Sequence, residues 1–173
     1  MANPSTSNAF SLLGLEARFD LDPEAIERAF FERSKELHAD KFATAPAAER
    51  VAALARSRAL NDAYQAIKKP VPRAEYLLVL AGVAIGDNER LDPAFLMEIL
   101  ELREALAEAR AAGKLAEVGR LQHLMATRRT AAVAALPALF AANDLPAIKE
   151  RLIVLRYLHR FLEECDAALD DEE

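Results

Sequence analysis

Apolar residues recur along the chain at intervals of three and four, which is the spacing that predicts α-helices. Two helices are predicted in the first half, from about Pro23 to Leu37 and from about Ala47 to Lys68. Their inward positions are Ile26, Phe30 and Leu37 in the first helix and Leu60, Ala63, Tyr64 and Ile67 in the second. Helices of similar length joined by a short loop pack antiparallel. The loop from His38 to Pro46 should therefore lie at the exposed tip of a helical hairpin.

Proline, glycine and capping residues set the boundaries around this hairpin. Asn8 can cap a short helix that Gly14 ends, because glycine readily adopts the left-handed conformation found after a helix. Pro70 and Pro72 are expected to stop the second hairpin helix, since neither residue can donate a backbone hydrogen bond. The segment from Arg73 to Ala81 is then predicted to be a short connecting helix.

The second half of the chain shows three longer helical patterns. Asp92, followed by proline, is the start signal of the first. The second should run from about Leu115 to Phe140, with a kink or fraying at Pro137, and the third from Pro146 to about Leu169. Three long helices with short connections predict an antiparallel three-helix bundle. The loop between the halves places the expected domain boundary after residue 82, giving domains 1–82 and 83–173.

Composition and charge narrow the class of protein. Charged residues make up 29% of the chain and hydrophobic ones 53%, so the chain should fold. Its net charge of −6 disfavours a nucleic-acid partner. The single cysteine, Cys165, rules out an internal disulfide and a cysteine-based zinc cluster. The N-terminus lacks a signal-peptide pattern, and the longest apolar run, Tyr76 to Ile85, is too short for a membrane span. We expect a cytoplasmic protein with no membrane partner.

The predicted hairpin tip carries His38 and Asp40, which have no core to support there. Taken alone, Asp40 would be interpreted as a helix cap or as an ion-pair partner of Lys41. A metal site is disfavoured because the other histidines lie far away in the sequence. A catalytic site is disfavoured as well, because no nucleophile neighbours the pair. We expect no cofactor, no resident metal and no enzymatic activity.

The helix from Asp92 to Ala112 has two apolar groups. One is an inward stripe formed by Phe95, Ile99, Leu102 and Leu106. The other lies to its side and consists of Leu96, Met97 and Leu100, bordered by the charged residues Glu101, Arg103, Glu104 and Glu108. The second group could pack on another helix of the bundle. It could equally form an exposed apolar patch with a charged rim, which marks a partner site.

The chain resembles a known family over nearly its whole length. The segment from Phe10 to Ile67 resembles a J-domain, the module that activates DnaK-type ATPase chaperones. Further runs are similar to the HscB subtype, the co-chaperones of iron–sulfur cluster assembly. The matching runs are Leu12-Leu13-Gly14-Leu15, His38-Ala39-Asp40-Lys41-Phe42, Arg73-Ala74-Glu75-Tyr76-Leu77-Leu78, Phe95-Leu96-Met97-Glu98 and Leu102-Arg103-Glu104.

This resemblance implies an L-shaped, two-domain co-chaperone with two protein partners. One partner is an HscA-type ATPase, whose ATP hydrolysis the chain would stimulate, and the other is an IscU-type iron–sulfur scaffold that the chain would deliver to it. The residues matching chaperone-binding positions are His38, Asp40, Arg28, Arg33, Lys35 and Lys41. Those matching scaffold-binding positions are Leu96, Met97, Leu100, Glu101, Arg103, Glu104 and Tyr157.

Ala39 departs from the family pattern, in which proline separates the histidine from the aspartate. Proline would hold His38 and Asp40 in one geometry, whereas alanine adds backbone freedom worth about 0.4–1 kcal/mol. An alternative is therefore a helical adaptor that binds a partner but stimulates the ATPase weakly or not at all. We expect Ala39→Pro to raise the stimulation.

Overall fold

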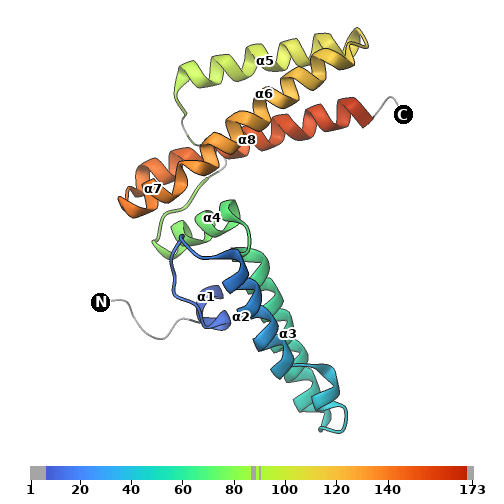
Figure 1. Cartoon of the computed structure of the whole chain (residues 1–173), viewed down its shortest axis with the longest axis vertical. Helices are drawn as coiled ribbons and strands as arrows, with labels where there is room; N and C mark the ends of the chain where they lie inside the picture. Colours follow the sequence, from blue (N-terminus) through green and yellow to red (C-terminus); the bar gives the residue numbers. More distant parts are fainter. Residues whose placement is uncertain (1–6, 87–88, 90, 171–173) are drawn as a thin grey trace. The chain divides into compact units, whose positions relative to one another are not determined.

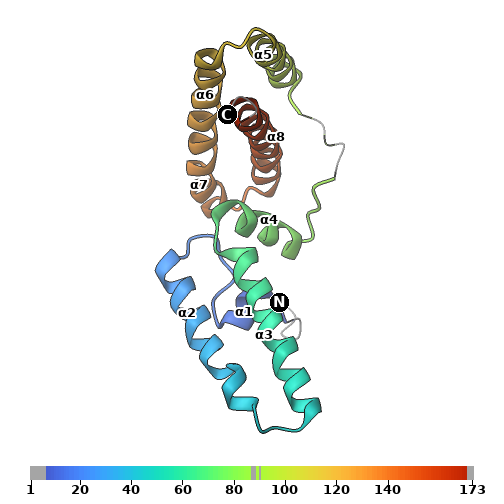
Figure 2. The ribbon, with the colours of Figure 1, turned by 90° about the vertical axis from the view of Figure 1, so that its right-hand side faces the viewer.

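The computed structural model describes residues 7–86, 89 and 91–170, and every regular element among them is a helix. This confirms the predicted all-α class. The chain divides into two compact units, Met1–Gly82 and Val83–Glu173. Each unit builds its core from its own helices, and Figures 1 and 2 show the helices of each in two views.

The first unit is a helical hairpin with short helices packed at its base. Its elements are α1 (Ala9–Leu13), α2 (Pro23–Glu36), the 3₁₀-helix η1 (Ala39–Phe42), α3 (Ala47–Ile67) and α4 (Pro70–Leu80). Helices α2 and α3 run antiparallel, as predicted, and α1 packs against both. Phe10, Leu13, Ile26, Leu60 and Ile67 form the centre of the core. Because this core fixes the base of the hairpin, η1 is held at its opposite end.

The start and end of α1 follow the capping prediction. The Asn8 side chain accepts a hydrogen bond from the Ser11 backbone N–H, and the Ser11 hydroxyl accepts one from the Asn8 backbone N–H. Gly14 ends the helix at φ 72°, a conformation that other residues adopt only with strain. A Cβ atom at position 14 would lie 2.8 Å from the Arg33 guanidinium. The backbone angle favours glycine here, whereas the flexible Arg33 side chain could move away from a Cβ atom.

Helix α3 ends before Pro70, as predicted, but the two prolines also have a role that was not predicted. Pro70 and Pro72 were expected to precede a helix starting at Arg73, but α4 begins at Pro70 itself. The first residues of a helix have no intrahelical acceptor for their N–H groups, so proline costs no hydrogen bond there and its fixed φ suits the helix. The prolines therefore separate two helices and also start the second one.

Arg73 is the buried charge that joins α4 to the rest of the unit. Its side chain is only 4% exposed. Its Nη1 donates to the Phe19 carbonyl at 2.7 Å, its Nε donates to the Ile67 carbonyl at 2.7 Å, and its guanidinium lies 5.7 Å from the Phe19 ring. Burial lowers the pKa of Arg73, and the Asp20 carboxylate opposes that shift. One side chain thus supplies partners for loop carbonyls that no helix satisfies.

Tyr76, one turn further along α4, makes a second such connection. Its hydroxyl accepts a hydrogen bond from the backbone N–H of Ala9 at 2.9 Å. That N–H is at the start of α1, where the helix itself offers no acceptor. The Tyr76 ring also packs on Phe10, with 5.9 Å between ring centroids. Arg73 and Tyr76 therefore position α1 and the loop before α2 against α4.

The second unit is a bundle of three long helices with one short one. Its elements are α5 (Pro93–Ala111), α6 (Leu115–Ala134), α7 (Leu136–Ala141) and α8 (Leu145–Asp170). Figure 1 shows α5, α6 and α8 running in alternating directions. Helix α8 packs along α6, and α5 packs mainly on α6. Fully buried side chains at the centre include Val118, Met125, Leu152, Leu158 and Phe161.

The predicted helix from Leu115 to Phe140 is wrong as one element. It ends at Ala134, and α7 begins at Leu136 with Pro137 in its first turn. Proline cannot donate to the carbonyl four residues earlier, and its ring crowds the preceding residue. The expected kink is therefore a division into two helices.

Cys165 is fully buried on α8. Its burial is the main cause that raises the pKa of the thiol to about 11, and the carboxylates of Asp166 and Glu164 add to the shift. At neutral pH the side chain is therefore an uncharged core residue. A thiol of this kind is a poor nucleophile.

Candidate partner-binding sites

His38 and Asp40 lie together at the tip of the hairpin. His38 is the N-cap of η1, and its Nδ1 atom lies 3.4 Å from the Asp40 backbone nitrogen and 3.3 Å from the Asp40 carboxylate. A neutral imidazole can accept from the backbone, whereas a protonated one can donate to the carboxylate. The side chains are 65% and 89% exposed. Both groups are therefore accessible to a partner.

The backbone at the tip has the geometry that a proline at position 39 would favour. His38 has φ −59° and ψ 136°. These are the extended angles to which proline restricts the residue before it. Ala39 is the first residue of η1, where an N–H has no acceptor within the helix. The residue before Ala39 therefore already has backbone angles that a proline at position 39 would favour.

The basic residues predicted for chaperone binding are exposed but do not form one row. Arg28 and Lys35, seven positions apart, share an outer face of α2, and Lys41 follows Asp40 in η1. Arg33 lies instead over Gly14, at the end of α1. Arg28 also pairs with the Glu24 carboxylate at 3.5 Å. Exposed pairs of this kind contribute little stability, so a partner can replace them.

The two apolar groups of α5 have different environments. On the inward stripe, Ile99 and Leu106 are buried, as predicted. Met97 is 58% exposed and Leu100 is 54% exposed, while Leu96 is half-buried. Leu96, Met97 and Leu100 are called the α5 patch below. Its two exposed members are not covered by another helix of the described chain, which leaves them available for a partner.

The charged residues around the α5 patch divide into two kinds. Glu101 and Glu104 are exposed beside the patch. Arg103 is partly buried and donates to the Glu164 carboxylate of α8 at 2.9 Å. Its Nε atom is buried and has no hydrogen-bond partner among the described residues. Arg103 therefore connects α5 to α8, while the two glutamates form the acidic rim.

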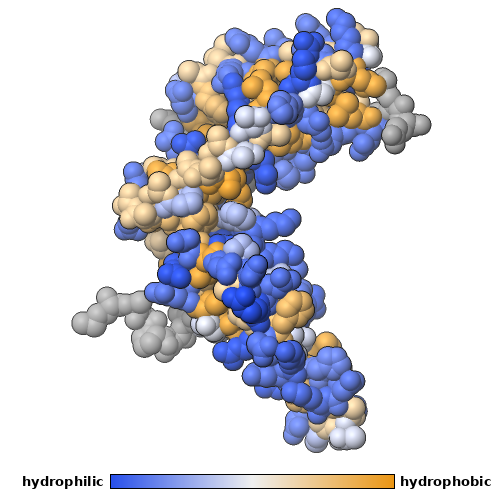
Figure 3. All heavy atoms as spheres, viewed as in Figure 1, coloured by the Kyte–Doolittle hydropathy of each residue, from blue (hydrophilic) through white to orange (hydrophobic). Residues whose placement is uncertain are grey.

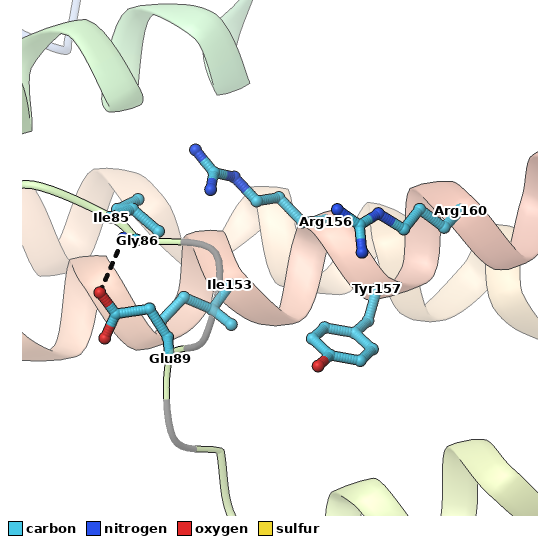
Figure 4. Close-up of a pocket in the computed structure, with 7 residues that line it drawn as sticks. All are labelled: Ile85, Gly86, Glu89, Ile153, Arg156, Tyr157 and Arg160. Carbon is cyan, nitrogen blue, oxygen red and sulfur yellow. Dashed lines mark hydrogen bonds between the residues drawn. The ribbon is translucent and has the colours of Figure 1, made fainter.

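Tyr157 of α8 lies beside the first turn of α5. Its ring meets the Phe95 ring edge-on, with 6.2 Å between centroids. Tyr157 also lines a small pocket, together with Ile85, Gly86, Glu89, Ile153, Arg156 and Arg160. Figure 4 shows that the Tyr157 ring and the Arg156 side chain leave α8 in different directions. The structure thus places Tyr157 next to the helix that carries the α5 patch.

Glu89 holds the segment before α5 on α8. It pairs with the Lys149 ammonium at 2.8 Å and accepts from the Gly86 N–H at 2.8 Å. The hydrogen bond from Lys149 is the main cause that lowers the pKa of Glu89. Sequence reasoning missed this pair, because a lone glutamate in a polar loop gives no signal of a distant lysine. It missed the role of Arg73 too, although a single arginine within an apolar helix is such a signal.

The described residues offer neither a metal-binding group nor a helix that could cross a membrane. Within residues 7–86, 89 and 91–170, no group of three or more histidine, cysteine or acidic side chains could hold a metal ion. None of the described helices combines the length and the apolar character that a membrane crossing requires.

Known proteins resemble this chain in sequence and in fold. A family model described as the HSCB C-terminal oligomerisation domain matches residues 91–166. A co-chaperone protein HscB homolog from Azoarcus sp. is 38% identical, covering 98% of this chain and 98% of its own. The chain belongs to the HscB family. An HscB homolog from Neisseria meningitidis is 33% identical over 94% of this chain and 99% of its own.

Solved HscB structures share the fold. Chaperone HscB from Vibrio cholerae matches with a TM-score of 0.81 and 32% identity, covering 95% of this chain and 99% of its own. Human HscB matches with a TM-score of 0.84 and 26% identity, covering 96% and 84%. The resemblance inferred from the sequence is thus confirmed. HscB proteins are co-chaperones rather than enzymes, and membership supports a co-chaperone role in iron–sulfur cluster assembly.

Proposed function

We propose that this HscB protein binds an IscU-type iron–sulfur scaffold with its second unit and an HscA-type ATPase with its first. It would deliver the scaffold to the ATPase and stimulate ATP hydrolysis there, in the cytoplasm, without bond chemistry of its own. The predicted domains, 1–82 and 83–173, would then be the ATPase-binding and scaffold-binding parts.

The exposure of Met97 and Leu100 is the observation that carries the scaffold-binding half of this proposal. Helix α5 already has a buried face, to which Ile99, Leu106 and Ala109 belong. Two further large apolar side chains on its outer face do not contribute to the core. Grouped apolar side chains with an acidic rim are the usual composition of a protein interface. A scaffold surface that combines apolar and basic groups would complement them.

The hairpin tip supports the ATPase-binding half. Asp40 presents a carboxylate that is almost fully exposed, and Lys35 and Lys41 lie near it in the chain. A carboxylate of this kind can form a charge-assisted hydrogen bond to a cationic side chain on the ATPase. Basic side chains on the hairpin would steer the encounter with an acidic surface, and salt would slow that encounter.

The alternative of an adaptor without ATPase stimulation depends on Ala39. The backbone at His38 already has angles suited to a following proline. Alanine in place of proline therefore leaves His38 in a suitable conformation but holds it less firmly. This favours a protein that stimulates its ATPase, with a smaller effect than a proline at this position would give.

Ala39→Pro should increase the stimulation of an HscA-type ATPase by about two- to fivefold at sub-saturating concentration. The substitution removes backbone freedom of about 0.4–1 kcal/mol that binding otherwise has to remove. Single-turnover ATP hydrolysis, measured with the wild type and the variant, tests this. His38→Ala serves as the reference for a disabled tip and should reduce the rate to that of the ATPase alone. Equal rates for wild type and His38→Ala would favour the adaptor instead.

A further inference from the structure

An apolar pocket opens at the tip of the hairpin beside η1. Its volume is about 200 Å³. Leu37 from the end of α2, Phe42 from η1 and Leu54 from α3 form much of its wall, with Arg50 and Ser57 also lining it. Sites for drug-sized molecules are larger, at roughly 300–1,000 Å³. The size of this pocket suits one or two apolar side chains.

The pocket wall is formed by large apolar side chains that solvent reaches. Leu54 is 72% exposed, and Leu37 and Phe42 are half-buried. The Arg56 guanidinium lies 6.0 Å from the centre of the Phe42 ring. Figure 3 shows apolar surface among the hydrophilic side chains of the hairpin. Apolar surface gathered in a hollow, with charged groups at its border, is the form of a protein-binding pocket.

The charge around the pocket is opposite in sign to that of the chain. The Arg56 guanidinium lies over the Phe42 ring, and none of the described lining residues is acidic, while the whole chain has a net charge of −6. Arg50 lines the pocket itself. A partner that fits it would carry an apolar side chain beside acidic ones.

We propose that this pocket receives a leucine- or phenylalanine-sized side chain, flanked by acidic residues, from the ATPase chaperone. The inference rests on the proposed function. Leu37 directly precedes His38, and Phe42 belongs to the same short helix as Asp40. A partner surface that contacts the exposed His38–Asp40 pair therefore meets the pocket in the same contact. The pair would supply polar contacts and the pocket would supply apolar burial.

Two substitutions test the pocket by opposite changes. Leu54→Gln removes apolar wall, whereas Ser57→Leu adds an apolar side chain that occupies the hollow. Each should raise the concentration giving half-maximal single-turnover ATP hydrolysis by an HscA-type ATPase about tenfold, the effect of losing one apolar contact. Val51→Gln is the matched control, because Val51 is 67% exposed on the same helix and outside the pocket lining. It should change the value less than twofold.

The outcomes separate this inference from the proposed function. Wild type that fails to stimulate the ATPase would overturn both. The wild type could stimulate the ATPase while His38→Ala does not. If Leu54→Gln and Ser57→Leu then had the same half-saturating concentration as Val51→Gln, the pocket inference alone would be overturned. Tighter binding by Ser57→Leu would also overturn it, since that result indicates a non-specific apolar surface. Circular dichroism and thermal unfolding confirm that each variant folds. The wild type could also self-associate through the pocket. If Leu54→Gln abolished that self-association without changing the concentration that gives half-maximal ATP hydrolysis, the pocket would be assigned to a second copy, and the proposal would be contradicted.

Discussion

Arg73→Met is expected to destabilise the first unit by about 3–5 kcal/mol. The substitution keeps an apolar stem of similar length but removes the guanidinium that donates to the carbonyls of Phe19, Leu21, Ile67 and Lys68. Breaking a buried set of charged hydrogen bonds by removing one partner costs several kcal/mol, because the remaining groups stay desolvated. Urea denaturation followed by circular dichroism measures the loss.

Arg18→Met is the matched control for this experiment. Arg18 is in the same unit, but its side chain is 59% exposed and its ion pair with Glu16 is long, at 3.9 Å. Removing such a charge changes stability by less than about 0.5 kcal/mol. Arg73→Lys should fall between the two, since an ammonium reaches fewer of the carbonyls than the planar guanidinium does. Equal stability of Arg73→Met and Arg18→Met would show that the buried hydrogen bonds do not hold α4 in place.

Replacing Leu96, Met97 and Leu100 together by alanine should weaken scaffold binding by at least about a hundredfold. Large apolar anchors at the centre of an interface cost more than about 1 kcal/mol each when truncated, and three of them exceed the 2.7 kcal/mol that a hundredfold requires. Helicity should persist, because alanine favours a helix and two of these side chains lie largely in solvent. Isothermal titration calorimetry with an IscU-type scaffold measures the affinity.

A double variant on another face controls for the loss of exposed apolar surface in general. Leu115 and Leu124 are both 39% exposed on α6. Changing both to alanine should leave scaffold affinity within about twofold, since neither belongs to the α5 patch. If the triple variant unfolded, or if both variants lost the same affinity, the patch would not be the scaffold site.

The sequence predicts the helices of this protein well because their signals are local. Asn8, Gly14 and Asp22 cap helices where expected, since each acts on backbone groups within a few residues. The errors arise at prolines. Pro70 begins a helix as well as following the end of α3, and Pro137 divides one helix into two. A proline is compatible with the first turn of a helix and incompatible with its interior, and the residue alone does not say which applies.

The positions of the candidate residues were predictable where the spacing along one helix decides them. The spacing puts Met97 and Leu100 on a different face from Ile99 and Leu106, but it left open whether another helix covers that face. The structure leaves both side chains exposed. The pairing of Arg103 with Glu164 joins two helices far apart in sequence, so the pattern along α5 placed Arg103 on the rim. The tip pocket was missed for the same reason, because α2, η1 and α3 form it together.

The coupling between the two partners is the central claim, and ATP hydrolysis measured against scaffold concentration tests it most directly. The rate of an HscA-type ATPase would be followed as IscU-type scaffold is added, at a fixed sub-saturating amount of this HscB protein. With the wild type, we predict that scaffold and HscB together raise the rate of ATP hydrolysis by more than the sum of their separate effects. With the triple alanine variant, the two effects should only add. The same dependence on scaffold with and without the wild-type protein would contradict the account.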